Sequence, residues 1–160
     1  MPFIVPEDRI EDFQYQINST GERAEHARPV LEKIMDKILE RNADAFATRG
    51  ATTGRYWAPL RASTIKRKES YPHLYWSAED PLVRSGALYE SLSFRDADHQ
   101  ILEVDDESLY LATTLDYADL HVTGTSRMPS RPPMTIPAKH AREYIGMLND
   151  FIFGEAEGNA

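Results

Sequence analysis

Cysteine is absent from this sequence of 160 residues, and long apolar runs are absent as well. Without cysteine the chain has no disulfide, no thiolate nucleophile, no iron–sulfur cluster and no cysteine-ligated zinc site. Its apolar runs fall far short of the roughly 18 residues of a membrane-spanning helix. The first residues, MPFIVPEDRIED, have no basic region and turn acidic at once, unlike a signal peptide. These absences predict a cytoplasmic product with no membrane partner.

Basic residues are scarce relative to acidic ones. Lys and Arg number 18 against 26 Asp and Glu, which gives a formal net charge of −8. General nucleic-acid binding depends on neutralising phosphates, so this balance argues against it. The hydrophobic fraction of 41% is ordinary for a globular protein. We expect a single domain over residues 1–153, followed by a disordered acidic tail at 154–160.

Apolar residues at helical spacing predict helices at both ends of the chain. A first helix begins near Pro6, and the polar residues 18–21 are expected to interrupt it. The main helix runs from about residue 22 to 49, and Pro29 either starts a second helix there or kinks a longer one. Its apolar stripe consists of Val30, Leu31, Ile34, Ile38, Leu39, Ala45 and Phe46. A last helix spans 138–153, and its predicted apolar face consists of Ala141, Tyr144, Ile145, Leu148 and Ile152.

Short apolar segments between these helices predict strands. Leu102 and Val104 are expected to pair with Leu109 and Leu111 in a hairpin, around a turn at 105–108. Further short elements are expected as a strand or arm at 3–5, helices at 62–68 and 85–92, a helix or turn at 116–122 and a strand at 134–136. The order favours an α+β fold. In it, a long N-terminal helix and a C-terminal helix pack against a small, mainly antiparallel sheet, with long irregular loops.

The most site-like cluster is DYADLH, at residues 116–121. Asp119 and His121 are candidates for a metal site or an acid/base pair. Residues two apart on a helix do not share a face, however, and the remaining histidines show neither HxxxH nor HExxH spacing. We expect Asp116 to cap a turn and His121 to pack locally. The sequence therefore predicts no enzyme, no metal site and no cofactor.

The segment 55–91 holds both tryptophans and the densest group of basic residues. Its charged and aromatic members are Arg55, Tyr56, Trp57, Arg61, Lys66, Arg67, Lys68, Tyr71, Tyr75 and Trp76. Aromatics and arginines are enriched in protein interfaces, but they also suit a nucleic-acid-binding module over residues 55–76. A solvated helix face with core tryptophans is the third interpretation. The acidity of the whole chain favours the other two interpretations over nucleic-acid binding.

Four sequence blocks follow one another in the order of a known family. They are W-x-P-L with T-I-x-x-K at 57–68, L-x-R-S-G-x-L at 82–88, Y-A-x-x-H-x-x-G at 117–124 and P-x-R-P at 129–132. In this order they resemble the virion-morphogenesis, or tail-completion, proteins of Mu-like phages. The resemblance covers residues 46 to about 153. An aromatic-rich insert at 71–80 departs from the family pattern, as does Pro132-Pro133-Met134, where the family often has a proline followed by a bulky apolar residue.

The resemblance implies a structural role at the head–tail junction of a virion, in a ring-forming neck or tail-completion protein that is assembled in the host cytoplasm. Its partners would be further copies of itself and other neck, tail or connector proteins, with passive contact to packaged DNA. No catalytic residues carry over. The residues expected at protein interfaces are Arg61, Lys66, Arg67, Lys68, Tyr71, Tyr75, Trp76, Arg127 and Arg131. Reversing the charge of Lys66, Arg67 and Lys68 is expected to abolish assembly.

Overall fold

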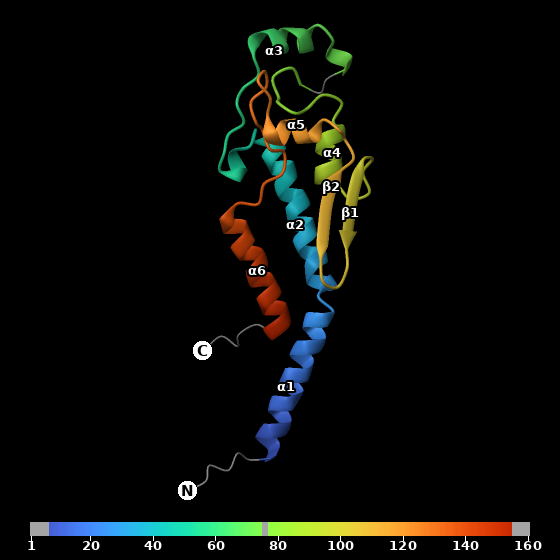
Figure 1. Ribbon diagram of the computed structural model, residues 1–160, viewed down its shortest axis with the longest axis vertical. Coiled ribbons are helices and arrows are strands. Elements are labelled where there is room, and N and C mark those ends of the chain that lie inside the picture. The colour runs from blue at the N-terminus through green and yellow to red at the C-terminus, as the bar shows by residue number, and fades with distance from the viewer. Residues whose placement is uncertain (1–6, 75–76, 155–160) are drawn as a thin grey trace.

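The fold is organised around one long helix, as the computed structural model of residues 7–74 and 77–154 shows (Figure 1). The helices are α1 (Glu7–Glu25), α2 (Arg28–Ala47), α3 (Ala62–Glu69), α4 (Ala87–Ser93), α5 (Ala118–Thr123) and α6 (Ala138–Phe153), with 3-10 turns η1 (Ala51–Thr53) and η2 (Pro72–Leu74). The strands are β1 (Gln100–Val104) and β2 (Leu109–Thr113). The predicted α+β class is confirmed. The segment expected at residues 3–5 and the tail beyond residue 154 lie outside the described residues.

Helix α2 forms the core because apolar residues cover a wide stripe of its surface. Its buried residues are Val30, Leu31, Ile34, Met35, Ile38, Leu39, Asn42, Ala45 and Phe46. The hairpin and α4 pack against one side of α2 and α6 against another (Figure 1), which explains the width of the stripe. Asn42 is tolerated inside because its amide donates to the Leu92 carbonyl at 2.7 Å. Pro29 starts α2 in the first turn, where its missing N–H has no helical partner to lose.

The hairpin has the predicted register. Leu102 pairs with Leu111 and Val104 with Leu109 in an antiparallel ladder. The turn is closed by the Asp105 carboxylate, which accepts the backbone N–H groups two and three residues later, at 2.8 and 2.6 Å. These hydrogen bonds lower the pKa of Asp105. The hairpin therefore forms from local pairing and turn chemistry, and its inner face packs on α2 and α4.

Helix α6 has the predicted bounds, but it packs against α2 and α1 instead of the sheet. Tyr144 is buried beneath the Arg41 guanidinium, which lies 5.9 Å from the ring centroid. The Glu143 carboxylate forms an ion pair with the Lys37 ammonium, at 3.1 Å between Oε1 and Nζ. The predicted apolar face is rotated, because Ile145 is 58% exposed. The inward face carries Tyr144, Met147, Leu148 and Phe151.

Helix α1 extends beyond the rest of the molecule and ends at the opposite extremity from α3 (Figure 1). The predicted interruption at residues 18–21 is wrong, because the helix continues to Glu25. Ser19 directs its hydroxyl to the Gln16 carbonyl at 3.1 Å, a bond compatible with helix. A glycine such as Gly21 costs a helix only about 1 kcal/mol relative to alanine, so the continuing helix overrides the local signal.

The strand predicted at residues 134–136 is also wrong. Of the residues that the structure describes, only 100–104 and 109–113 form strands. Met134 and Ile136 are exposed and are bracketed by Pro133 and Pro137. Proline cannot donate to a strand ladder, so an apolar segment of three residues between prolines has no means of extending a sheet.

Candidate docking surface on helix α3

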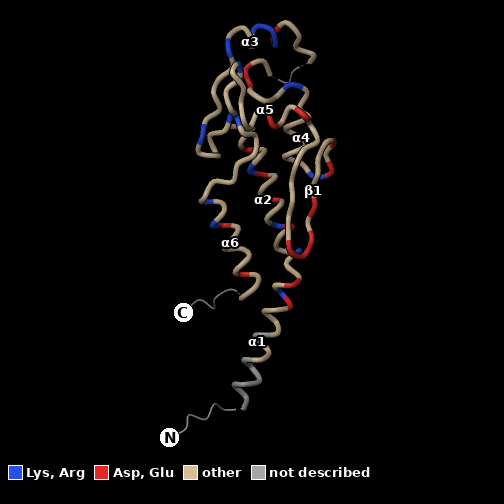
Figure 2. The backbone as a smooth tube through the Cα atoms, in the orientation of Figure 1, with Lys and Arg blue, Asp and Glu red and all other residues tan. Residues whose placement is uncertain are grey.

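Helix α3 carries the exposed part of the basic cluster. Arg61 stands at its N-cap position, and Lys66 and Arg67 lie in its last turn, all three exposed. Cations near the C-terminal end of a helix interact favourably with its dipole. Figure 2 shows these basic positions on α3, while acidic residues border the hairpin. The three side chains are exposed, and their contact with a partner stays a prediction.

Lys68 does not belong to that surface. Its side chain is 5% exposed, and its amine donates to the carbonyls of Asp80 at 2.9 Å and Val83 at 3.1 Å. Burial lowers the pKa of this amine, and the nearby Asp80 carboxylate opposes the shift. The expectation that Lys68 contacts a partner is therefore corrected. Lys68 instead anchors the loop at residues 77–85 beneath α3.

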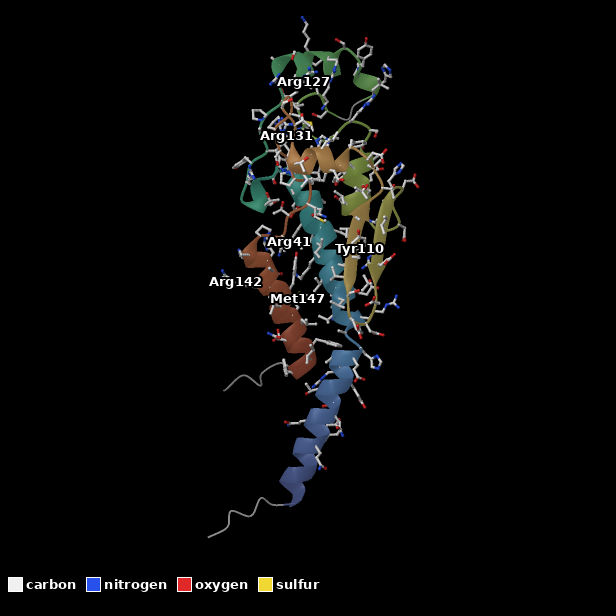
Figure 3. All side chains as sticks on the ribbon, viewed as in Figure 1. Arg41, Tyr110, Arg127, Arg131, Arg142 and Met147 are labelled. Carbon is white, nitrogen blue, oxygen red and sulfur yellow. The ribbon has the colours of Figure 1, made fainter. Side chains whose placement is uncertain are left out.

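Arg131 is likewise internal. Its side chain is 5% exposed. Its guanidinium donates to the carbonyls of Ala58 at 2.6 Å and Pro59 at 3.0 Å, while its backbone N–H donates to the carbonyl of His121 at 2.7 Å. Arg127, four residues earlier in the same loop, is exposed (Figure 3). The interface assignment stays a prediction for Arg127 and is corrected for Arg131, which joins three segments of the fold.

Trp57 also connects the segment before α3 to the loop that carries Arg131. Its indole N–H donates to the Pro132 carbonyl at 3.2 Å, and its ring meets Phe46 edge-on at 5.3 Å between centroids. The turn after α2 makes room for the indole at Gly50, which has φ +86°. A Cβ there would lie 2.6 Å from the Arg55 carbonyl and 2.8 Å from the indole ring. The W-x-P-L and P-x-R-P blocks thus meet in a packed and hydrogen-bonded junction.

The Y-A-x-x-H-x-x-G block forms α5 and its end. The Tyr117 and His121 rings meet edge-on at 5.9 Å. Burial, followed by the charge of Arg131, lowers the pKa of His121, and its Nδ1 is buried without a hydrogen-bond partner. Gly124 has φ +74°, and a Cβ there would lie 2.8 Å from the backbone nitrogen of Ser130. Glycine at this position lets the loop fold back against α5.

Residues 116–121 place their polar side chains in different surroundings. Within residues 7–74 and 77–154, no group of three or more His, Cys, Asp or Glu residues is placed to hold a metal ion. Asp116 and Asp119 are exposed, whereas His121 turns its unpaired nitrogen into the fold. His121 packs locally, as the sequence predicted.

A groove of about 880 Å³ is lined by residues of α3 and α5 and by residues 73–74 and 80–85. Its apolar lining includes Leu60, Leu74, Leu82, Val83, Leu120 and Met128. Arg67, His73 and Arg84 also line it. No sequence pattern predicted this groove, because its apolar residues come from five separate segments. Two large apolar residues of this lining, Leu74 and Leu120, are 43% and 49% exposed.

The aromatic residues predicted at the interface are only partly placed. Tyr71 is 51% exposed and meets His73 edge-on at 6.4 Å. Tyr75 and Trp76 lie outside the described residues. The candidate docking surface therefore consists of Arg61, Lys66, Arg67, Tyr71 and the adjoining groove. We call it the α3 surface.

Comparisons with protein-family models, curated proteins and solved structures find no match. The resemblance to virion-morphogenesis proteins therefore rests on the four sequence blocks. Across residues 7–74 and 77–154, no helix combines the length and the apolar character that crossing a membrane requires.

Proposed function

We propose that this chain is a structural, non-enzymatic component of a phage virion that completes the neck or tail at the head–tail junction as a subunit of a ring. The observation that carries the proposal is the junction of Trp57, His121 and Arg131. Residues from three of the four family-like blocks meet there through the bonds to Pro132, Ala58 and Pro59 and the Arg131–His121 backbone bond. The blocks thereby serve to hold α3 and its loop, a use of motif residues that suits an assembly protein.

The charge pattern supports docking by α3. Lys68 and Arg131 use their charges inside the fold, whereas Arg61, Lys66 and Arg67 are presented outward on a protein of net charge −8. An acidic partner surface, including that of a second copy, would match them. Complementary charge of this kind directs encounter and orientation more than it adds affinity.

A second candidate function is favoured by one observation. Tyr56 and Tyr71, which are 78% and 51% exposed, flank the same basic helix. Exposed aromatic rings beside cations are the means by which single-stranded nucleic acid is bound without sequence preference. A nucleic-acid-binding module over residues 55–76 therefore remains the alternative. It predicts binding of a fluorescent oligonucleotide at low salt that weakens steeply as salt rises. No binding of the oligonucleotide at low salt would exclude this alternative function.

The test of the proposed function is a charge reversal of the exposed cations alone. Lys66→Glu/Arg67→Glu should leave the thermal midpoint nearly unchanged, because both residues are exposed, and should abolish joining of heads to tails when particles are assembled with the variant. Lys68 is left unchanged in this experiment, because reversing the charge of its buried amine would disturb the fold. The matched control is Lys139→Glu/Arg142→Glu, two exposed cations on α6, which should assemble normally.

The readout is electron microscopy of particles together with antibody labelling of the chain. The expected label lies at the head–tail junction of wild-type particles, and the Lys66/Arg67 variant should give separate heads and tails. Normal joined particles from that variant, or a label elsewhere on the particle, would refute the proposal.

A further inference from the structure

The α3 surface and the start of α1 lie at opposite extremities of the molecule (Figure 1), and their amino-acid sequences carry net charge of opposite sign. We propose that the N-terminal half of α1 from one copy of the chain docks into the groove beside α3 of the next copy. The inference rests on the ring proposed above and identifies the contact that would build it. The occupant is thus a second copy of this chain, bound through an amphipathic acidic helix.

The groove has the features of a site for a helix with apolar anchors. Its volume is about 880 Å³, and its apolar residues include Leu74 and Leu120, 43% and 49% exposed. These large apolar side chains lie open to solvent at one place, which marks a binding surface more often than chance. Arg67, which lines the groove, and Lys66 beside it add positive charge at the edge.

The start of α1 supplies the complementary chemistry. Residues 7–13, EDRIEDF, carry four carboxylates and one arginine, a net charge of −3. The sequence spaces Ile10, Phe13 and Ile17 by three and four residues, the period of one helix face. Recognition of a helix in a groove uses anchors at this spacing, and the acidic residues suit the cations that border the α3 groove.

The contact must lie between two copies, because the two surfaces of one chain are far apart. Helix α1 runs away from the body, and its first residues end at the far extremity from α3 (Figure 1). A continuous helix cannot bring Glu7 back to the groove of its own chain. A contact between two different surfaces of identical copies is heterologous, and it generates a ring when the rotation between copies closes.

The size of the contact sets its expected strength. Residues 7–17 of a helix span about 16 Å. One face of so short a helix buries less than the roughly 800 Å² per partner of a stable standard interface. A single contact should therefore be weak and sensitive to salt. In a closed ring every subunit makes the contact twice, once through α1 and once through the groove, so closure reinforces it.

The absence of cysteine makes the contact directly testable by disulfide cross-linking. Glu11→Cys and Thr64→Cys, the latter lining the groove, are mixed as separate single-cysteine proteins and oxidised mildly. We expect a dimer that contains one chain of each kind, with a yield that falls as salt rises. The control replaces Thr64→Cys with Arg142→Cys on α6, an exposed residue away from the groove (Figure 3). A yield for the Thr64 pair no higher than for the Arg142 pair overturns the proposal.

Charge exchange gives a second, independent readout. Lys66→Glu/Arg67→Glu and Glu11→Lys/Asp12→Lys should each weaken self-association by about tenfold or more in sedimentation experiments. A mixture of the two variants should recover association, because each supplies the surface that the other lacks. Variants that associate like wild type, or a mixture that stays dissociated, contradict the docking. If both tests fail while antibody still labels the head–tail junction, the docking is wrong and the proposed function stands.

Discussion

Replacing Arg131 by methionine tests whether the P-x-R-P block serves the fold. The guanidinium donates two hydrogen bonds, to the carbonyls of Ala58 at 2.6 Å and Pro59 at 3.0 Å. Methionine keeps much of the length of the side chain and removes both donors. The two carbonyls then have no donor from residue 131, so the segment that leads into α3 loses its attachment to the loop after α5.

The magnitude follows from those two bonds. Hydrogen bonds from a charged donor contribute about 1.5–3 kcal/mol each, so their loss gives about 3–6 kcal/mol. Methionine avoids the cost of burying a guanidinium, which offsets part of this loss. We expect Arg131→Met to lower the free energy of unfolding by about 3 kcal/mol, or the thermal midpoint by roughly 6–12 °C for a chain of this size. Arg131→Lys should lose about half as much, since an ammonium lacks the planar fork.

The assay is urea denaturation followed by circular dichroism, with Arg127→Met as the control. Arg127 is exposed in the same loop, and its replacement should change the free energy of unfolding by no more than about 0.5 kcal/mol. If the two variants unfold at the same urea concentration, the hydrogen bonds of Arg131 do not hold the fold together.

Two further predictions concern the same junction. Gly50→Ala should lower the free energy of unfolding by about 3 kcal/mol, because a Cβ would lie 2.6 Å from the Arg55 carbonyl at φ +86°. Gly54→Ala, with φ +78° and no atom within 4 Å, should cost about 1 kcal/mol in the same denaturation experiment, and equal losses would contradict the packing. The pKa of His121 is lowered in the folded state from 6.5, so the unfolded chain binds the proton more readily. Stability is therefore complete above the unfolded pKa and falls as pH drops through 6.5 towards the folded pKa. Between about pH 7.5 and pH 5 the urea midpoint of wild type should fall more than that of His121→Gln, and parallel curves would exclude His121 as the cause.

The elements that the sequence predicted well are those set by local periodicity. The stripe on α2, the bounds of α6 and the Leu102–Leu111 pairing each follow from spacings within one or two adjacent segments. The rotated face of α6 shows the limit of that reasoning. Ile145 fits the helical period as well as Met147 does, and only the position of α2 and α1 decides which of them is buried.

The role of each basic residue depended on contacts that are distant in sequence. Lys66, Arg67 and Lys68 are consecutive, and nothing in their order identifies the buried one. The carbonyls of Asp80 and Val83 identify Lys68 as the buried one, because they lie beneath α3 and accept hydrogen bonds from its amine. Consecutive residues on a helix point in directions about 100° apart, so a basic run on a docked helix rarely acts as one surface.

The buried and the exposed basic residues occupy different positions in the family-like blocks. In T-I-x-x-K the specified lysine is the buried Lys68, and the unspecified positions are the exposed Lys66 and Arg67. In P-x-R-P the specified arginine is the buried Arg131, and in Y-A-x-x-H-x-x-G the unspecified Leu120 is exposed in the groove. In these examples the buried Lys68 and Arg131 hold the fold together, whereas the exposed Lys66, Arg67 and Leu120 are positions that can meet a partner. Substitutions at Lys66, Arg67 or Leu120 should therefore change what the chain binds while the fold stays intact.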